Sequence, residues 1–289
     1  MKILITIPHY YKLSNNGHGS GSNRPDRRIK ALTACLFNIY SLFSKSQKII
    51  DIHKKSAFSV LQDSTFDIDV IICTANNQTL LNHINLPPTF FKHRSTLLED
   101  PKFLDFECQK ALKENLGKYD YYCFMEDDLI INDALFFEKL IWFNSLFGIK
   151  SLLQPNRYES SINGQVLKAY VDGNIRPEVT SVYQNRDENK TLTTDVLGKE
   201  VIFERPYNPH SGCYFLTQSQ LEYWANQPYF LDYDVSFISP LESSATLGIM
   251  KTFNIYKSSL NNVNFFEIQH FGDQFLKLIG KNVILTIEA

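Results

Sequence analysis

Strands and helices are predicted to alternate through the first 150 residues of this chain. Short apolar runs with high β propensity are separated by stretches whose apolar residues recur at helical spacing. This alternation is typical of a sheet of mostly parallel strands that is flanked by helices. The sequence therefore predicts an α/β fold. The predicted elements are strands at 2–7, 68–74 and 119–125, and helices from about residues 25, 103 and 135.

The pattern changes after residue 150. Leu152 and Leu153 predict a short strand. The polar stretch 158–205 has weak alternation and is interpreted as hairpins or a long excursion. A helix is expected at 218–225 and a last strand at 264–270. We expect one domain with two halves, 1–150 and 151–289.

Composition narrows the classes of protein that this chain can be. A net charge of −2 does not favour a nucleic-acid partner, which normally binds a basic surface. The five cysteines are scattered without a C-x-x-C spacing, so a zinc site is not expected and a reducing compartment fits. The N-terminal apolar run is too short for a signal peptide, and no apolar run approaches the ~20 residues of a membrane span. A cytoplasmic protein is expected.

Polar side chains follow the end of each of the first three predicted strands. Ligands bind beyond the carboxyl ends of the strands in open α/β sheets, so these side chains should converge on one cleft. The residues are Pro8, His9 and Tyr10 after the first strand, Asn76 after the second, and Glu126, Asp127 and Asp128 after the third.

Three adjacent carboxylates at a strand end repel one another unless a cation or a proton offsets their charge. Because side chains alternate along a strand, Glu126 and Asp128 can point the same way while Asp127 points opposite. Two carboxylates suit Mn²⁺ or Mg²⁺, which take oxygen ligands and keep sites open for phosphates. The alternative is an acidic first turn that complements the dipole of the next helix.

The segment 119–130, with its Glu126-Asp127-Asp128, resembles the D-x-D strand of GT-A glycosyltransferases, and the opening 3–8 resembles the first strand of that family. The resemblance implies a nucleotide-sugar-binding half, 1–150, and an acceptor-binding half, 151–289. It also implies that Asp128 ligates the metal and that Glu126 reaches the metal shell or the donor ribose. Asp127 is assigned to donor binding. Glu126 departs from the family pattern, in which aspartate is commoner at this position.

The resemblance implies further site residues. His270, after the last strand, would complete the metal shell, although a strand-end histidine can also be structural. Glu242 would be the base that takes the acceptor proton, with Asp232 and Asp234 as rivals and a helix-start acid as the alternative. Ser211 and Gly212 would face the acceptor. Candidate diphosphate contacts are Arg94 and either Arg27 or Arg28.

The resemblance thus implies a metal-dependent glycosyltransferase that uses a nucleotide-diphosphate sugar (a UDP-sugar is favoured) and a saccharide-type acceptor. Inversion of configuration is favoured, and retention stays open. Two alternatives stay open, a sugar nucleotidyltransferase and a non-catalytic carbohydrate-binding protein. The glycine-rich segment 17–21 matches neither a P-loop nor a dinucleotide fingerprint and is interpreted as a loop over the donor. Peripheral membrane contact is left open.

Overall fold

The central sheet is the feature that places the candidate site. The structure, a computed structural model, describes residues 1–13, 23–60 and 66–286, so the segment 17–21 lies outside the described residues. The strand order in this sheet is β13-β6-β1-β4-β5, and all neighbours are parallel except β13, which is antiparallel to β6. The predicted mostly parallel α/β sheet is confirmed. The bounds are β1 (Lys2–Pro8), β4 (Asp67–Ala75), β5 (Lys92–Thr96), β6 (Tyr121–Met125) and β13 (Cys213–Thr217).

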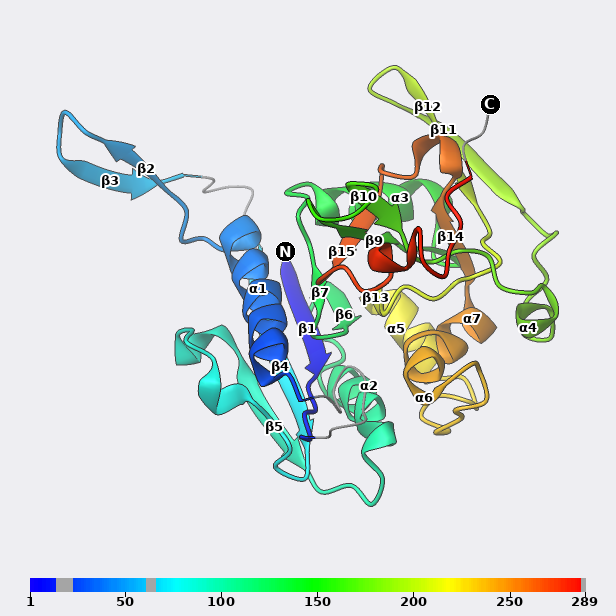
Figure 1. Cartoon of the computed structure of the whole chain (residues 1–289), viewed down its shortest axis with the longest axis horizontal. Helices are drawn as coiled ribbons and strands as arrows, with labels where there is room; N and C mark the ends of the chain where they lie inside the picture. The colour runs from blue at the N-terminus through cyan, green and yellow to red at the C-terminus, as the bar shows by residue number, and fades with distance from the viewer. Residues whose placement is uncertain (14–22, 61–65, 287–289) are drawn as a thin grey trace.

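Helices cover both faces of this sheet (Figure 1). Ile3, Ile5 and Ile7 of β1 share one hydrophobic cluster with α1 (Pro25–Phe43) and α3 (Phe136–Phe147). Leu4 points to the other face, into a cluster with α2 (Leu104–Glu114), α5 (Gln218–Ala225) and α7 (Gly248–Thr252). Burial on both faces explains why β1 is apolar almost throughout rather than alternating.

The start of α3 differs from the prediction. The sequence places its start at about residue 135, whereas the helix begins at Phe136 with Leu135 at the N-cap. The side chain of Asn132, just before it, donates to Tyr158 and to Gln269, and Asp133 accepts from the backbone N–H of Leu135 at 2.9 Å. Asn132 is thus used for tertiary contacts, whereas Asp133 satisfies a backbone N–H at the start of the helix.

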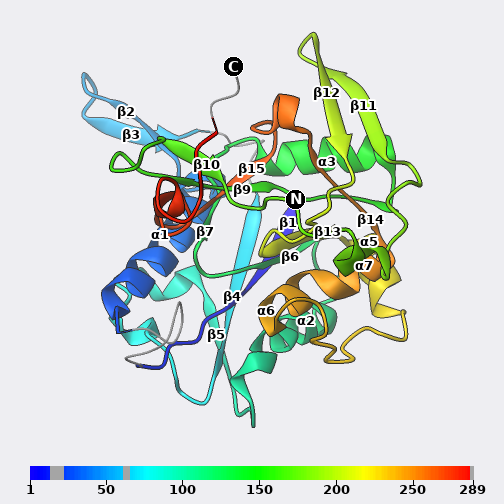
Figure 2. The same ribbon diagram turned by 45° about the vertical axis from the view of Figure 1, so that its right-hand side comes forward.

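Two four-stranded sheets build most of the second half, with strand orders β10-β9-β15-β7 and β11-β12-β14-β8. The two predicted hairpins of the polar stretch are β9–β10 and β11–β12. Figure 2 shows these sheets beside the central sheet. Since β13 belongs to the central sheet, the two halves of the chain are interleaved. The bounds are β7 (Leu129–Ile130), β8 (Ser151–Leu153), β9 (Asn156–Ser160), β10 (Lys168–Tyr170), β11 (Thr191–Val196), β12 (Lys199–Glu204), β14 (Asn254–Ser258) and β15 (Glu267–His270).

The remaining helices of the described residues are short. The turn between α6 and α7 is π-helical and spans Ser243–Leu247. The other short helices are α4 (Glu178–Ser181), α6 (Pro240–Glu242) and the 3₁₀ turns Leu81–His83, Pro88–Phe90, Pro101–Phe103, Leu260–Asn262 and Leu276–Leu278.

Sequence reasoning missed several strands. One is the separate hairpin of β2 (Lys48–Asp51) and β3 (Ser56–Ser59), which pairs with no other strand of the described chain. The edge strand β5 and the strand β14 were also missed, because their short, polar-rich segments carry no clear period-2 alternation.

The cysteines and the helices add two further findings. All five cysteines are buried and free. Within residues 1–13, 23–60 and 66–286, no helix combines the length and the apolar character that crossing a membrane requires.

Candidate active site

A cleft of about 480 Å³ opens at the carboxyl ends of β1 and β6. Several side chains that the sequence singled out line it together, although they come from distant parts of the chain. Arg28 and Asp105 also line it, as do Leu241 and its neighbours. The predicted residues in the lining are Pro8, Tyr10, Glu126, Asp127, Asp128 and His270.

Asp127 is the buried anchor of this cleft. Its carboxylate is 3% exposed and pairs with His9 Nδ1 at 2.5 Å and with the guanidinium of Arg28. Burial acts to raise the pKa of Asp127, but Arg28 and His9 outweigh it and hold that pKa below its ordinary value. His9 is fully buried, and its other ring nitrogen accepts from the backbone N–H of Leu80 at 3.1 Å. Asp127, which His9 orients, therefore holds Arg28 in the cleft. Donor binding by His9 and Asp127, which the sequence suggested, stays a prediction.

Asp128 lies between Arg28 and His270. Its Oδ2 is 3.1 Å from Arg28 Nη1 and 3.7 Å from His270 Nε2, while its Oδ1 is buried without a hydrogen-bond partner. His270, at the end of β15, is held by its other nitrogen, because Nδ1 is 2.9 Å from the buried carboxylate of Glu159. Burial alone would lower the pKa of His270, but Glu159 and Asp128 raise it above its ordinary value.

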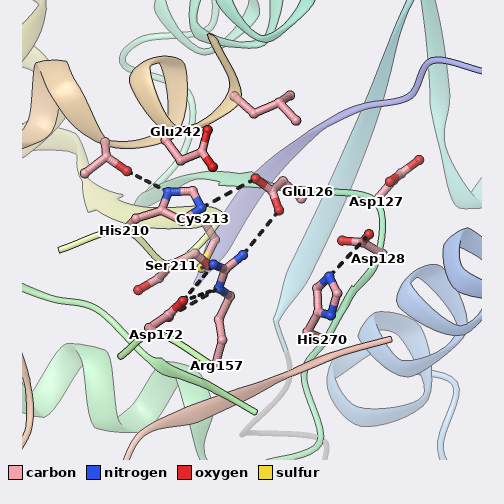
Figure 3. Close-up of polar contacts among 12 residues, drawn as sticks. Glu126, Asp127, Asp128, Arg157, Asp172, His210, Ser211, Cys213, Glu242 and His270 are labelled. Carbon is pink, nitrogen blue, oxygen red and sulfur yellow. Dashed lines mark hydrogen bonds and ion pairs between the residues drawn. The ribbon is translucent and has the colours of Figure 1, made fainter. Parts of the chain in front are cut away.

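Glu126 turns toward a different set of partners (Figure 3). Its carboxylate is 3.6 Å from Arg157 Nη1 and 3.9 Å from His210 Nε2. Arg157 in turn binds Asp172 through two nitrogens, and Lys257 Nζ lies 3.0 Å from the same aspartate. Glu126 and Asp128 thus have different basic partners, although both line the same cleft, and their sharing of one ion stays a prediction.

Burial and neighbouring charges together shift the pKa values of Glu126, His210 and Asp172. It raises the pKa of Glu126 to about 8, against the opposing effect of Arg157 and with the help of Asp128. Burial also lowers the pKa of His210 well below its ordinary range, and the positive charge of Arg157 adds to this. The pKa of Asp172 is held below its ordinary value, because Lys257 and Arg157 outweigh its burial.

A tight turn holds Glu126 against β13. Gly212 has a φ of +64°, and a Cβ atom placed there would lie 2.6 Å from Glu126 Oε2. The N–H of Glu126 donates to the carbonyl of Gly212 at 2.9 Å. Glycine is thus required both by the left-handed backbone and by the close approach. Ser211, which was assigned to the acceptor, is buried and donates to the carbonyl of Pro155 at 2.9 Å.

The wall opposite the carboxylates comes from α2 and α6. Leu241 and its two preceding residues line the cleft, and Glu242 follows them, half-buried, with its carboxylate accepting from the hydroxyl of Ser239. Asp105 of α2 is buried and accepts from the hydroxyl of Ser244 at 2.6 Å. Burial raises the pKa of Asp105 to about 7, partly offset by that hydrogen bond.

Besides His9, two of the predicted donor residues do not line the cleft. Asn76 has a φ of +55° and uses its side-chain amide to bind the backbone of Leu98, at 2.7 and 2.9 Å. Arg94 lies on β5 and pairs with Glu114 and, at 3.5 Å, with Glu107. Both side chains have structural partners in this conformation.

Sequence reasoning missed Arg157, Glu159, Asp172 and Lys257. The first two are on β9, in the stretch that was interpreted only as hairpins. Their alternation on a short strand was a signal, because charged residues at every second position of a buried strand need partners. No comparable signal marked Asp172, which is an isolated aspartate in a loop.

The side chains do not form a complete metal site as they stand. In the described ranges, no group of three or more His, Cys, Asp or Glu side chains is placed to hold a metal ion. Two features still fit an ion beside Asp128. Its buried Oδ1 lacks a partner, and His270 is oriented by a carboxylate on its other nitrogen, as metal-binding histidines commonly are.

Comparisons with known proteins give a fold-level likeness only. No protein-family model matches the sequence, and no curated protein matches it. Among solved structures, the chain is similar to S. aureus TarS 1-349, with a TM-score of 0.43 and 14% identity, covering 93% of this chain and 60% of that chain. A second TarS structure gives 0.44 and 13%, covering 94% and 37%, and TarS 1-349 in complex with UDP-GlcNAc gives 0.41 and 14%, covering 96% and 60%. This chain spans at most 60% of those chains, and such scores identify neither a family nor an activity.

Proposed function

We propose that this protein is a glycosyltransferase that moves a sugar from a nucleotide-diphosphate donor, with a UDP-sugar as the favoured donor, to a hydroxyl of a saccharide-type acceptor. The observation that carries the proposal is the grouping of Arg28, Asp128 and His270 in one cleft at the carboxyl end of the sheet. In α/β sheets this is the edge where nucleotides bind.

The charges of this group suit a diphosphate. Arg28 is fixed by Asp127 and offers a planar guanidinium, which pairs well with phosphate oxygens. Its positive charge would stabilise the negative charge that grows on a departing diphosphate. His270, on the other side of Asp128, is the residue that would ligate a metal ion there, as a neutral imidazole.

We extend the proposal to a divalent ion. Asp128 and His270 are the residues that would hold Mn²⁺ or Mg²⁺, with the remaining ligands left to phosphate oxygens and water. Such an ion supplies neutralisation of the leaving diphosphate. Glu126 is left out of this ligand pair, because its carboxylate faces Arg157 and His210.

Glu242 is the proposed base of an inverting transfer. Its place directly after the cleft-lining Leu241 supports this role, and its bond to Ser239 would hold the carboxylate in position. The acceptor O–H would lose its proton to Glu242 while the oxygen forms a bond to the donor carbon, and the bond from that carbon to the diphosphate breaks. Asp105, on the same wall of the cleft, is the residue to compare with it.

The test is release of nucleotide from a panel of UDP-, GDP- and CMP-sugars with Mn²⁺, with and without a chelator. We expect one donor to be consumed, and Asp128→Asn and His270→Ala to lower the rate at least ~100-fold, the loss typical of a missing electrostatic contact to the transition state. Asp133→Asn is the matched control, because Asp133 pairs with Lys139 outside the cleft lining. A loss in Asp128→Asn that Asp133→Asn shares would contradict the assignment.

The same panel separates the alternatives. Consumption of a nucleoside triphosphate with a sugar phosphate would favour a nucleotidyltransferase. Stabilisation of the fold by a donor that is never consumed would favour a binding protein. For the base, Glu242→Gln should lower transfer by about 10²- to 10⁴-fold without weakening donor binding. Glu222→Gln, on the exposed face of α5, should change neither.

A further inference from the structure

The hairpin of β2 and β3 has no cover from the rest of the described chain. Residues 48–60, here called the arm, include no buried residue, and both views show the arm reaching away from the body (Figures 1 and 2). A two-stranded hairpin alone is marginally stable in water, and it normally packs against a further element. The arm therefore requires something other than the described residues to cover it.

Apolar side chains lie on both faces of the arm and at its tip. Ile49 pairs with Phe58 on one face, and Ile50 pairs with Ala57 on the other. Ile50 is 75% exposed, and Ile52, at the tip, is 84% exposed. A groove on a protein would cover one face of such a ribbon, whereas a lipid interface surrounds the tip and both faces together.

The charge of the arm also favours a lipid interface. It holds Lys48, Lys54 and Lys55 against a single acid, Asp51, so it is positive although the chain as a whole has a net charge of −2. Two arms that met each other would bring like charges together. Lysine heads beside inserted isoleucines fit anionic lipid headgroups, because lysine stems can lie along apolar chains while their ammonium groups stay in the headgroup layer.

The tip is already ordered for this role. The N–H of Lys55 donates to the carbonyl of Ile52, and the N–H of Lys54 donates to the carboxylate of Asp51 at 2.9 Å. Polar backbone groups at the tip are thus satisfied within the arm, which reduces the cost of placing them at a lipid surface.

We propose that the arm docks this protein on an anionic lipid surface, with Ile50 and Ile52 inserted and Lys54 and Lys55 at the headgroups. The cleft lies at the other end of α1, because Arg28 is in the first turns of that helix and the arm follows its last residue. From Arg28 to Phe43, the last residue of α1, the helix rises by roughly 23 Å. Docking is therefore independent of the chemistry in the cleft.

Labelling at a single site tests the docking directly. Since the five native cysteines are buried, Ile52→Cys places an exposed thiol for an environment-sensitive dye. With vesicles of equal parts phosphatidylglycerol and phosphatidylcholine, the dye should shift to the blue. Leu197→Cys is the matched control, because Leu197 is 99% exposed at the tip of another hairpin, β11–β12, and its dye should not respond.

Vesicle binding by sedimentation gives the energetic test. Lys54→Gln with Lys55→Gln should weaken binding to these vesicles about 25-fold, roughly fivefold per lysine, and added salt should do the same. Ile50→Ser with Ile52→Ser should weaken it at least ~10-fold, and Leu197→Ser should not. Circular dichroism would verify that each variant keeps its fold, and donor hydrolysis in solution should be unchanged.

Two outcomes would overturn the proposal. One is wild-type protein that stays unbound at every concentration of the anionic vesicles, whatever its activity toward donors. The other is a concentration-dependent dimer that the Ile50→Ser and Ile52→Ser changes abolish, which would assign the arm to a second copy of this chain instead.

Discussion

Replacing Asp127 by Asn should lower the free energy of unfolding of this protein. The substitution removes the charge that faces Arg28 and His9 in a site where Asp127 is 3% exposed. Removing one partner of a buried ion pair leaves the other charge unpaired and costs about 3–5 kcal/mol. Asp128 compensates only in part, because it contacts Arg28 at 3.1 Å from a more exposed position.

The expected shift in melting temperature follows from the chain length. At about 2.1 cal/mol/K per residue, 289 residues give an unfolding entropy of roughly 0.6 kcal/mol/K. Asp127→Asn should therefore lower the melting temperature by about 5–8 °C, measured by calorimetry near pH 7. Because the folded-state pKa of Asp127 is lowered, its stabilising effect is present at neutral pH and should disappear as the pH falls through that pKa.

A surface pair provides the control. Asp67 contacts Lys45 at 2.5 Å, but both side chains are more than half exposed, so Asp67→Asn should cost less than about 1 kcal/mol. If Asp127→Asn melted together with Asp67→Asn and the wild type, the buried anchor that we infer for Arg28 would be wrong.

Two further predictions concern the same cleft. Gly212→Ala should lower the free energy of unfolding by about 1–3 kcal/mol in chemical denaturation, because the backbone there is left-handed. The loss should be larger still because the new Cβ would meet Glu126 Oε2. Gly117→Ala, with a φ of +85° and open space around it, should show only the backbone cost. Asp105 has a raised folded-state pKa of about 7, so between about pH 4 and 7 the folded protein keeps a proton that the unfolded chain releases. The free energy of unfolding should therefore fall by up to ~4 kcal/mol as the pH rises through this range. Asp105→Asn should remove that slope in denaturation curves measured across this range, and an unchanged slope would contradict the assignment.

The sequence was informative where a pattern reports burial directly. The apolar runs that became β1, β4 and β6 are buried in the sheet, and Pro25 opens α1 at a position where proline is favoured. The same reasoning could not place β13 beside β6, because antiparallel pairing across some 90 residues depends on the whole chain and not on a local period.

The candidate site shows the same division. Glu126, Asp127 and Asp128 could be singled out, because three adjacent acids after an apolar strand are unusual. Their separate partners could not be predicted, because Arg28 and Arg157 come from segments distant in sequence. The predicted sharing of one ion by Glu126 and Asp128 rested on the alternation of side chains along a strand. The strand β6 ends at Met125, before both residues, and the sharing stays a prediction.

The position of β15 has a consequence for synthesis of this protein. This strand lies between β9 and β7 and brings His270 beside Asp128, so a residue near the end of the sequence meets one from its middle. While the ribosome is still adding residues before 267, both neighbouring strands lack their shared partner and the cleft lacks its histidine. A nascent chain would thus lack the complete cleft that the proposed transfer requires until β15 has emerged from the exit tunnel.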